Sequence, residues 1–239
     1  MAERLKDAVV LLSGAGGGIG RALTKALLAA GVAEIISAGR DHPRAHERVR
    51  EETVDITHLP SVRALAERYA DRVTVVIACA GVNANQRLFT PGFEAAARRE
   101  VEVNYFGLLN LASAFAPAMQ ARGRGLFVHL LTFLSHVNLP LMAGYCASKA
   151  AAHSLTQALR AELGRSGVQV CGVYPAVVDT AMSRDIPGPK LAPAELAQAL
   201  VQAIESGAED VYPGPAADAY RMYAADPKAA ERGMAARLA

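Results

Sequence analysis

The stretch from residue 8 to residue 30 limits the choice of fold more than any other part of the sequence. An apolar run rich in β-formers, Ala8 to Leu12, predicts a buried strand. A turn with five glycines follows between Ser13 and Gly20, and an amphipathic helix is expected from Arg21 to Ala30. A strand, a glycine-rich turn and a helix bring backbone N–H groups and a helix N-terminus to a phosphate. The stretch therefore predicts a dinucleotide-binding α/β fold.

The glycine spacing leaves the subtype of this fold open. Gly14, Gly18 and Gly20 fit G-x-x-x-G-x-G, whereas Gly14, Gly17 and Gly20 fit G-x-x-G-x-x-G. The usual Rossmann pattern G-x-G-x-x-G fails, because Ile19 stands where its third glycine would fall. The loop alone does not decide between the first two patterns.

Further apolar segments predict a doubly wound, mostly parallel sheet of about seven strands with helices on both faces. Strands are expected at 34–38, 53–56, 73–78, 125–131, 168–174 and 210–212, and helices at 61–69, 93–121, 145–161 and 193–206. The long helix from 93 is expected to bend at Pro117. Asp226-Pro227 predicts the start of a final helix in the tail. No internal repeat or linker is apparent, so residues 1–239 are expected to form one Rossmann domain with a C-terminal helical tail.

Composition and charge exclude several classes of function. The formal net charge is only +2, so neither nucleic acid nor an anionic membrane is implied as a partner. No apolar run approaches the length of a membrane span, and no signal peptide is apparent. His42 and His46 have i,i+4 spacing without a third ligand, so no metal site is expected. A cytoplasmic location is expected from three cysteines without a C-x-x-C pair: Cys79, Cys146 and Cys171.

The end of the second predicted strand bears on the choice of cofactor. In dinucleotide folds this end faces the adenosine ribose, where an acidic residue binds the 2′-hydroxyl and an arginine accommodates a 2′-phosphate. Gly39 leaves room here and Arg40 supplies positive charge. This favours NADP(H), with NAD(H) as the second choice, although Arg40 is also explained as a solvated loop residue.

Tyr145 and Lys149 are the strongest candidates for chemistry. They stand four residues apart on a predicted helix, so the phenol and the ammonium share a face. A nearby cation favours phenolate and lowers the phenol pKa by roughly 1–3 units from about 10, which suits acid–base work at neutral pH. The same spacing arises by chance on many helices. Thr132 ends the fifth predicted strand, and ligands in such sheets bind beyond strand C-termini.

Taken in order, these elements resemble the short-chain dehydrogenase/reductase family, in its small single-domain branch, over nearly the whole length. The chain is too short for the longer branch, to which the other glycine pattern belongs. The resemblance rests on Gly14-x-x-x-Gly18-x-Gly20, Asp55, Ala80-Gly81, Asn104, Tyr145-x-Ala147-Ser148-Lys149, and Pro175 through Thr180.

The resemblance implies an NAD(P)-dependent oxidoreductase that interconverts an alcohol and a carbonyl group. Tyr145 would be the acid–base, and Lys149 would bind the nicotinamide ribose and lower the tyrosine pKa. Asn104 would hold a water of a proton relay, and Thr180 would bind the carboxamide. The implied cofactor-binding residues are Gly14, Gly16, Gly17, Gly18, Ile19, Gly20, Arg40, Asp55, Ile56, Ala80, Gly81, Asn104, Tyr145, Lys149, Pro175, Val178 and Thr180.

Three positions depart from the family pattern. Thr132 stands where the family normally has serine, and its methyl group restricts the rotamers of the hydroxyl. Ser135 is the fallback for this role. Ala78-Cys79 replace the usual Asn-Asn pair, and Ala176 replaces a glycine.

The substrate site is expected over Thr132 and Tyr145, and core packing explains its candidate wall residues equally well. The segment 181–192 is short, so an open cleft that accepts bulky hydrophobic ketones is expected. The candidates for a mainly apolar wall are Leu134, Met142 and Met182.

Two functions remain open at this point. One is an NADPH-dependent carbonyl reductase, working in reverse as an alcohol dehydrogenase, on a hydrophobic small molecule. The other is an NADP-binding sensor or scaffold that kept the fold and lost efficient chemistry, suggested by Thr132 and the missing asparagines. The resemblance also implies a homo-oligomer, a tetramer or a dimer, with helices from Phe93 and Tyr145 in a symmetric four-helix contact.

Overall fold

The computed structural model describes residues 4–43 and 45–238, and its centre is one seven-stranded parallel sheet. Residues 1–3, 44 and 239, which the expected domain 1–239 includes, lie outside the described residues. The strand order is β3-β2-β1-β4-β5-β6-β7, so the doubly wound α/β fold is confirmed. The strands are β1 Val9–Ser13, β2 Glu34–Gly39, β3 Val49–Thr53, β4 Val75–Ala78, β5 Gly125–Leu130, β6 Val168–Val173 and β7 Asp210–Val211.

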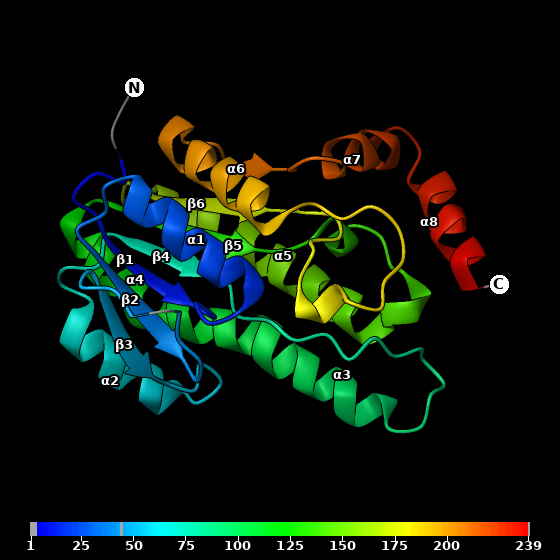
Figure 1. Cartoon of the computed structure of the whole chain (residues 1–239), viewed down its shortest axis with the longest axis horizontal. Coiled ribbons are helices and arrows are strands. Elements are labelled where there is room, and N and C mark those ends of the chain that lie inside the picture. The colour runs from blue at the N-terminus through cyan, green and yellow to red at the C-terminus, as the bar shows by residue number, and fades with distance from the viewer. Residues whose placement is uncertain (1–3, 44, 239) are drawn as a thin grey trace.

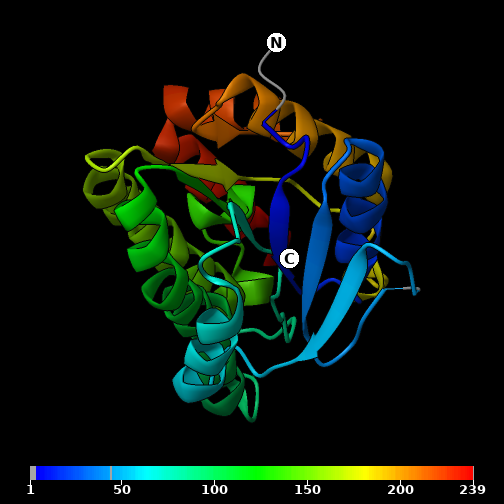
Figure 2. The same cartoon turned by 90° about the vertical axis from the view of Figure 1, so that its left-hand side faces the viewer.

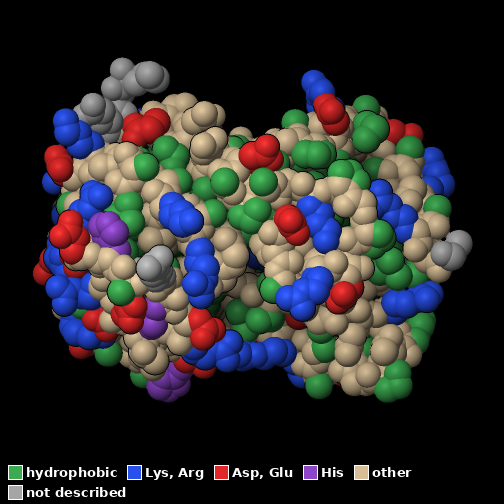
Figure 3. All heavy atoms as spheres, in the orientation of Figure 1, with side chains coloured by type: hydrophobic (Ala, Val, Ile, Leu, Met, Phe, Trp, Pro, Cys, Tyr) green, Lys and Arg blue, Asp and Glu red, His purple; other side chains and the backbone are tan. Residues whose placement is uncertain are grey.

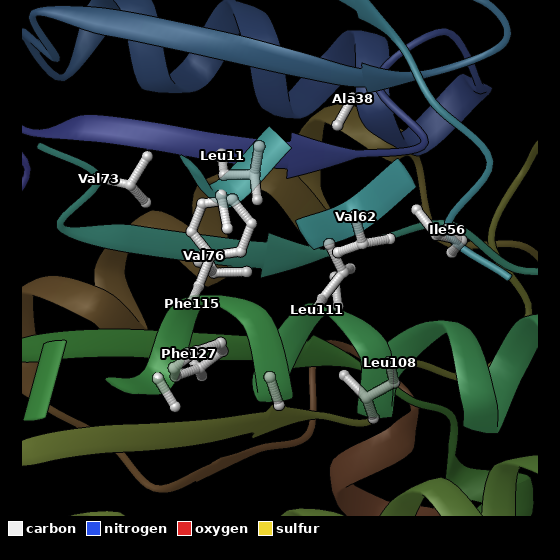
Figure 4. Packing of buried hydrophobic residues seen from close by; sticks show 14 of the residues in the cluster. Leu11, Ala38, Ile56, Val62, Val73, Val76, Leu108, Leu111, Phe115 and Phe127 are labelled. Carbon is white, nitrogen blue, oxygen red and sulfur yellow. The ribbon is translucent and has the colours of Figure 1, made fainter. Parts of the chain in front are cut away.

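Helices cover both faces of the sheet (Figures 1 and 2). One face carries α1 Gly18–Ala29 and α6 Pro193–Ser206; the other carries α2 Leu59–Tyr69, α4 Gly107–Arg122 and α5 Ala143–Gly164. Figure 4 shows Phe115 and Leu111 of α4 facing the strands that carry Leu11 and Val76. Because the central strands are buried on both faces, their sequences are continuous apolar runs. The remaining helices are α3 Phe93–Val101, α7 Ala216–Ala225 and α8 Pro227–Ala235.

The third strand was predicted at the wrong place. The sequence prediction was 53–56, whereas β3 is Val49–Thr53 and pairs with β2. As an edge strand, β3 carries mostly polar and exposed side chains, so no apolar run marks it. The buried side chains of Val54 and Ile56 belong to the turn that follows it.

The long helix predicted at 93–121 is interrupted at Glu102–Phe106 by a π-helical turn between α3 and α4. The predicted bend at Pro117 is not where the helix type changes, because Pro117 lies inside α4. A π-turn adds a residue while the helix stays continuous, so a prediction from helical composition over 93–121 did not detect it. The turn places Asn104 in the protein interior, with an exposed fraction of 3%.

The arrangement of the sheet fixes where a ligand can enter. β2 and β3 lie on one side of β1, whereas the strands from β4 onward lie on the other side. Such a reversal opens a crevice at the C-terminal ends of the two central strands. Here these ends are Ser13 of β1 and Ala78 of β4. None of the described helices has the length and apolar character to span a membrane.

Candidate active site

The glycine loop follows β1 directly and is packed against its neighbours through backbone. A Cβ on Gly14, whose φ is +70°, would lie 2.8 Å from the Ala80 backbone, and one on Gly20 would lie 2.2 Å from the Gly14 carbonyl oxygen. A Cβ on Gly18 would lie 2.9 Å from Thr180 Cγ2. For Gly17 the nearest atom would be 3.4 Å away, an ordinary contact. The crowded positions therefore include all three glycines of G-x-x-x-G-x-G, the pattern of the small branch.

A cleft of about 320 Å³ lies over this loop and the ends of the central strands. α1 begins at Gly18, and no side chain caps its first turn, so its free N–H groups are available to a ligand. A helix N-terminus beside a glycine-rich turn, whose backbone a ligand can approach closely, fits the pyrophosphate of a dinucleotide. The predicted cofactor residues that line this cleft are Gly14, Gly16, Gly17, Gly18, Ile19, Gly20, Arg40, Asp55, Ile56, Ala80, Gly81 and Thr180.

Two arginines line the cleft, although only Arg40 was predicted. Arg99 reaches it from α3, because the tertiary packing turns that side of the helix toward the ligand space. Hydrogen bonds from Thr57 lower the pKa of the Asp55 carboxyl, and the positive charges of Arg99 and Arg40 lower it further. The three charged groups thus lie close enough to interact.

A serine replaces part of the bracing that the missing asparagines would give. The Ser13 hydroxyl at the end of β1 accepts hydrogen bonds from the backbone N–H groups of Cys79 and Ala80, both at 3.2 Å. The segment after β4 is therefore held against β1 without a polar side chain at position 78 or 79.

A second cavity, of about 380 Å³, is the candidate substrate cavity. It is lined by Tyr145, Lys149 and Thr132. The Thr132 hydroxyl donates to the Pro175 carbonyl oxygen at 3.2 Å and accepts from the Leu134 N–H at 3.3 Å. The fallback Ser135 is buried and lines neither cavity. The two cavities adjoin, since they share Ile19, Cys79, Gly81, Thr180 and Met182.

The predicted effect of Lys149 on the tyrosine is wrong in this structure. Lys149 Nζ donates to the Leu130 carbonyl oxygen at 2.7 Å, and burial lowers the pKa of Lys149 to about 8. Burial also raises the pKa of Tyr145, and a hydrogen bond with Thr132 only partly opposes this. Desolvation favours the neutral form of both groups. The phenol is therefore protonated at neutral pH.

Asn104 ties the segment after β4 to α5. Its Oδ1 accepts from the Val82 N–H, and its Nδ2 donates to the Val82 carbonyl oxygen and to Ser148 Oγ, each at 2.9 Å. The Ser148 hydroxyl in turn donates to the Tyr145 carbonyl oxygen at 2.7 Å. A Cβ on Gly81 would lie 3.2 Å from Asn104 Oδ1 and 3.6 Å from Lys149 Nζ. Asn104 thus lies next to the site without lining either large cavity, and its role in a relay stays a prediction.

Comparison with known proteins agrees with this geometry. The family model for short chain dehydrogenases matches residues 8–190. The chain belongs to this family. A short chain dehydrogenase from Burkholderia cenocepacia, solved in complex with NADP, is 38% identical with a TM-score of 0.91 and coverage of 96% of this chain and 98% of that one.

Curated relatives of this short-chain dehydrogenase include an uncharacterized oxidoreductase of Staphylococcus saprophyticus. It is 31% identical over 218 residues, which cover 84% of this chain and 92% of the relative. The (3R)-3-hydroxyacyl-CoA dehydrogenase of Mus musculus is 30% identical, with coverage of 77% and 79%. The protein is therefore an NAD(P)-dependent oxidoreductase that acts on CH–OH or C=O groups.

The wall of the second cavity contains more residues than those predicted from the sequence of this dehydrogenase. Leu134, Met142 and Met182 line it as expected, and so do Pro175 and Val178, which were assigned to the cofactor. Figure 3 shows a hollow near the middle of one face, with hydrophobic side chains at its floor. The sequence analysis missed the C-terminal tail, since no local pattern marks its four lining residues: Pro215, Ala219, Met234 and Arg237.

The tail also changes the expectation of an open cleft. The short segment 181–192 contributes Ile186 and Pro187 to the wall, and residues of α7 and α8 add to it. Asp226 caps α8 by accepting from the Ala229 N–H at 2.9 Å, which confirms the predicted start of the final helix. Among the described residues, no three His, Cys, Asp or Glu side chains are grouped so that they could hold a metal ion.

Proposed function

We propose that this short-chain dehydrogenase is an NADPH-dependent carbonyl reductase, working in reverse as an alcohol dehydrogenase, on mainly hydrophobic ketones or secondary alcohols. The observation that carries the proposal is one apolar cavity that Tyr145, Lys149 and Thr132 line together and that adjoins the cleft over the glycine loop. Bound nicotinamide would supply or accept the hydride in this cavity.

The residues around the cleft suit NADP(H) better than NAD(H). Arg40 and Arg99 offer two guanidinium groups to a 2′-phosphate, and arginine binds phosphate through paired N–H donors. The NADP complex of the Burkholderia relative supports the same choice. At the other end of the cleft, Thr180 lines both cavities, and Pro175 and Val178 line the adjoining substrate cavity. The nicotinamide would lie there.

Each polar group of the pocket has a distinct task in this proposal. The Tyr145 hydroxyl donates its proton to the substrate oxygen during reduction, and its raised pKa keeps that proton available at neutral pH. The Thr132 hydroxyl turns from the Pro175 carbonyl to the substrate oxygen and orients it. Lys149 holds the cofactor ribose, and Asn104 holds a water that links the lysine to solvent.

The first test is turnover with a panel of ketones, followed by loss of NADPH absorbance. Tyr145→Phe should lower kcat by about 10²–10⁴-fold, the usual contribution of a general acid, because phenylalanine has no proton to give. NADPH binding, measured by fluorescence titration, should be retained in the variant. Tight NADPH binding by the wild-type protein without any ketone-dependent turnover would instead support the sensor or scaffold function.

We also propose a homo-oligomer, a dimer or a homotetramer, built through α3, α4 and α5. Phe89 is 95% exposed and Leu88 52% exposed beside these helices. A groove next to them has a floor of small and apolar residues: Phe93, Ala97, Val101, Pro140, Ala143, Gly144 and Ala147. Small residues let helices approach closely. A monomer by light scattering at working concentration would contradict this.

We propose a cytoplasmic enzyme, with the whole chain acting as one nucleotide-binding domain and α7 and α8 as its tail. Three free cysteines, two of them buried, are consistent with a reducing compartment. One sheet carries a buried apolar cluster on each of its two faces, which supports a single domain.

A further inference from the structure

The charges that line the substrate cavity are unbalanced. Its wall is mostly apolar, with Phe133, Leu139, Ile186 and Met234 among the residues that the sequence analysis did not name. Among the described residues, no Asp or Glu lines the cavity, and the charged residues that do are Lys149 and Arg237. A wholly neutral substrate would need no second cation in such a wall.

The two cations are in different situations. Lys149 is 5% exposed, and its ammonium already donates to the Leu130 carbonyl oxygen. Arg237 is exposed, and no described residue forms a hydrogen bond or ion pair with it. Two other cations of the tail are paired, Arg221 with Asp218 and Lys228 with Glu231. Arg237 is therefore the cation of the cavity that is available to a ligand.

The tail is packed so that it holds Arg237 at the cavity. Met234 of α8 packs against two clusters of buried residues, one that contains Phe133 and one that contains Leu139 and Met142. Arg237, three residues further on in the short 3-10 helix Ala236–Leu238, lines the same cavity as Met234. Since residues three apart lie on one side of a helix, the contacts of Met234 fix the side on which the arginine lies.

We propose that Arg237 binds an anionic group of the substrate, so that the substrate is an apolar ketone or secondary alcohol that also carries a carboxylate or a phosphate. The inference rests on the proposed reductase function, because Tyr145 must act on the carbonyl group in the same cavity. A guanidinium suits this task, since its planar N–H groups pair with two oxygens of a carboxylate or phosphate. The apolar wall would bind the hydrocarbon part between the two ends.

The test compares matched substrates with and without the charge. A medium-chain keto acid is paired with its methyl ester, and a keto-alcohol phosphate with its free alcohol, so that the two sources of the anion are distinguished. Both pairs are assayed with the wild-type protein, Arg237→Gln, Arg237→Lys and Arg232→Gln. Arg232 is the matched control, because it is an exposed arginine of α8 that does not line the cavity.

For one of the two pairs, the wild-type protein should prefer the anionic member in kcat/KM. Arg237→Gln should reduce this preference by about tenfold or more, mainly through KM, as expected for a lost charge-assisted hydrogen bond. Arg237→Lys should keep part of the preference, and Arg232→Gln all of it. No preference in the wild-type protein, or an equal loss in the Arg237 and Arg232 variants, would overturn the inference while turnover of the neutral ketone upheld the reductase.

If the protein turns over no ketone, a binding measurement still separates the two proposals. The keto acid is titrated into the protein with NADP⁺ and its binding is measured by calorimetry. If no ketone is turned over but acid binding still depends on Arg237, the reductase function fails and the anion site stands. The keto-alcohol phosphate is titrated in the same way, and if the binding of both anions is the same in the wild-type protein and Arg237→Gln, the anion site fails.

Discussion

The cofactor cleft and the substrate cavity meet at Ile19 and Thr180, but they are built in opposite ways. The cleft lies over the segments that follow β1, β2, β3 and β4, and it is rich in glycine. At three of these glycines, Gly14, Gly16 and Gly20, a Cβ would lie 2.8 Å or less from backbone atoms. The cavity is formed mainly by side chains that come from five separate segments, the last of them in the tail. The cleft therefore tolerates little change, whereas the cavity can be altered one side chain at a time.

This difference separates the reaction from its specificity. The backbone of a nucleotide-binding crevice must keep one shape, because the pyrophosphate contacts N–H groups and not side chains. A wall of Leu, Met and Phe side chains can be refilled with others of similar volume at small cost. Family membership consequently gives the chemistry of this enzyme, whereas the substrate depends on side chains of this particular chain.

The largest expected effect comes from adding one methyl group to the cleft. In Gly20→Ala the new Cβ would meet the Gly14 carbonyl oxygen, a backbone atom that cannot move away alone. Overpacking of this kind costs about 1–3 kcal/mol of stability, and the distorted loop should weaken NADPH binding by about 100-fold or more. Thermal melting and fluorescence titration with NADPH would measure both effects.

Gly17→Ala is the matched control, because its Cβ would make only an ordinary contact at 3.4 Å. Its backbone has φ −73° and ψ 171°, which alanine adopts without strain. Because Gly17 itself lines the cleft, thermal melting is the readout for this pair. Equal losses of stability in the two variants would mean that the loop is not held by backbone crowding, and the contrast between cleft and cavity would disappear.

The same contrast explains what the sequence could and could not predict. The strand, the glycine turn and α1 are contiguous, so their pattern is local and was recognised. Tyr145 and Lys149 were found because helical spacing is also local. Arg99 and Arg237 were missed, because only tertiary packing brings α3 and the tail to the ligand. The direction of the Tyr145 pKa shift was wrong for a related reason, since desolvation depends on burial that a sequence does not display.

A smaller effect is expected where side chains do enter the cleft. Arg40→Gln and Arg99→Gln should each lower the ratio of NADPH to NADH affinity by about tenfold, because one charge-assisted contact to the 2′-phosphate is removed. Arg98→Gln is the control, since Arg98 is exposed on the same helix and does not line the cleft. Fluorescence titration with each cofactor gives the ratio. A change in Arg98→Gln as large as that in Arg99→Gln would indicate a general effect of charge.

The smallest expected effect concerns pH, and it tests which side of the site controls the tyrosine. If burial in the substrate cavity dominates, the pKa of Tyr145 lies above its usual value of about 10, and the phenol keeps its proton at neutral pH. Reduction needs that proton, so the tyrosine should cause no fall in kcat/KM for ketones until the pH is above about 9. A fall near pH 8 would come from Lys149, because burial lowers the pKa of its ammonium to about 8. Oxidation needs the deprotonated form of Tyr145, so the rate of oxidation should rise with pH below the pKa of that tyrosine.

If the charge of Lys149 dominated instead, the pKa of Tyr145 would be lowered and the rate of reduction would already fall near neutral pH. Thr132→Val sharpens the test, because losing the hydrogen bond that lowers the tyrosine pKa should move the fall in rate to still higher pH.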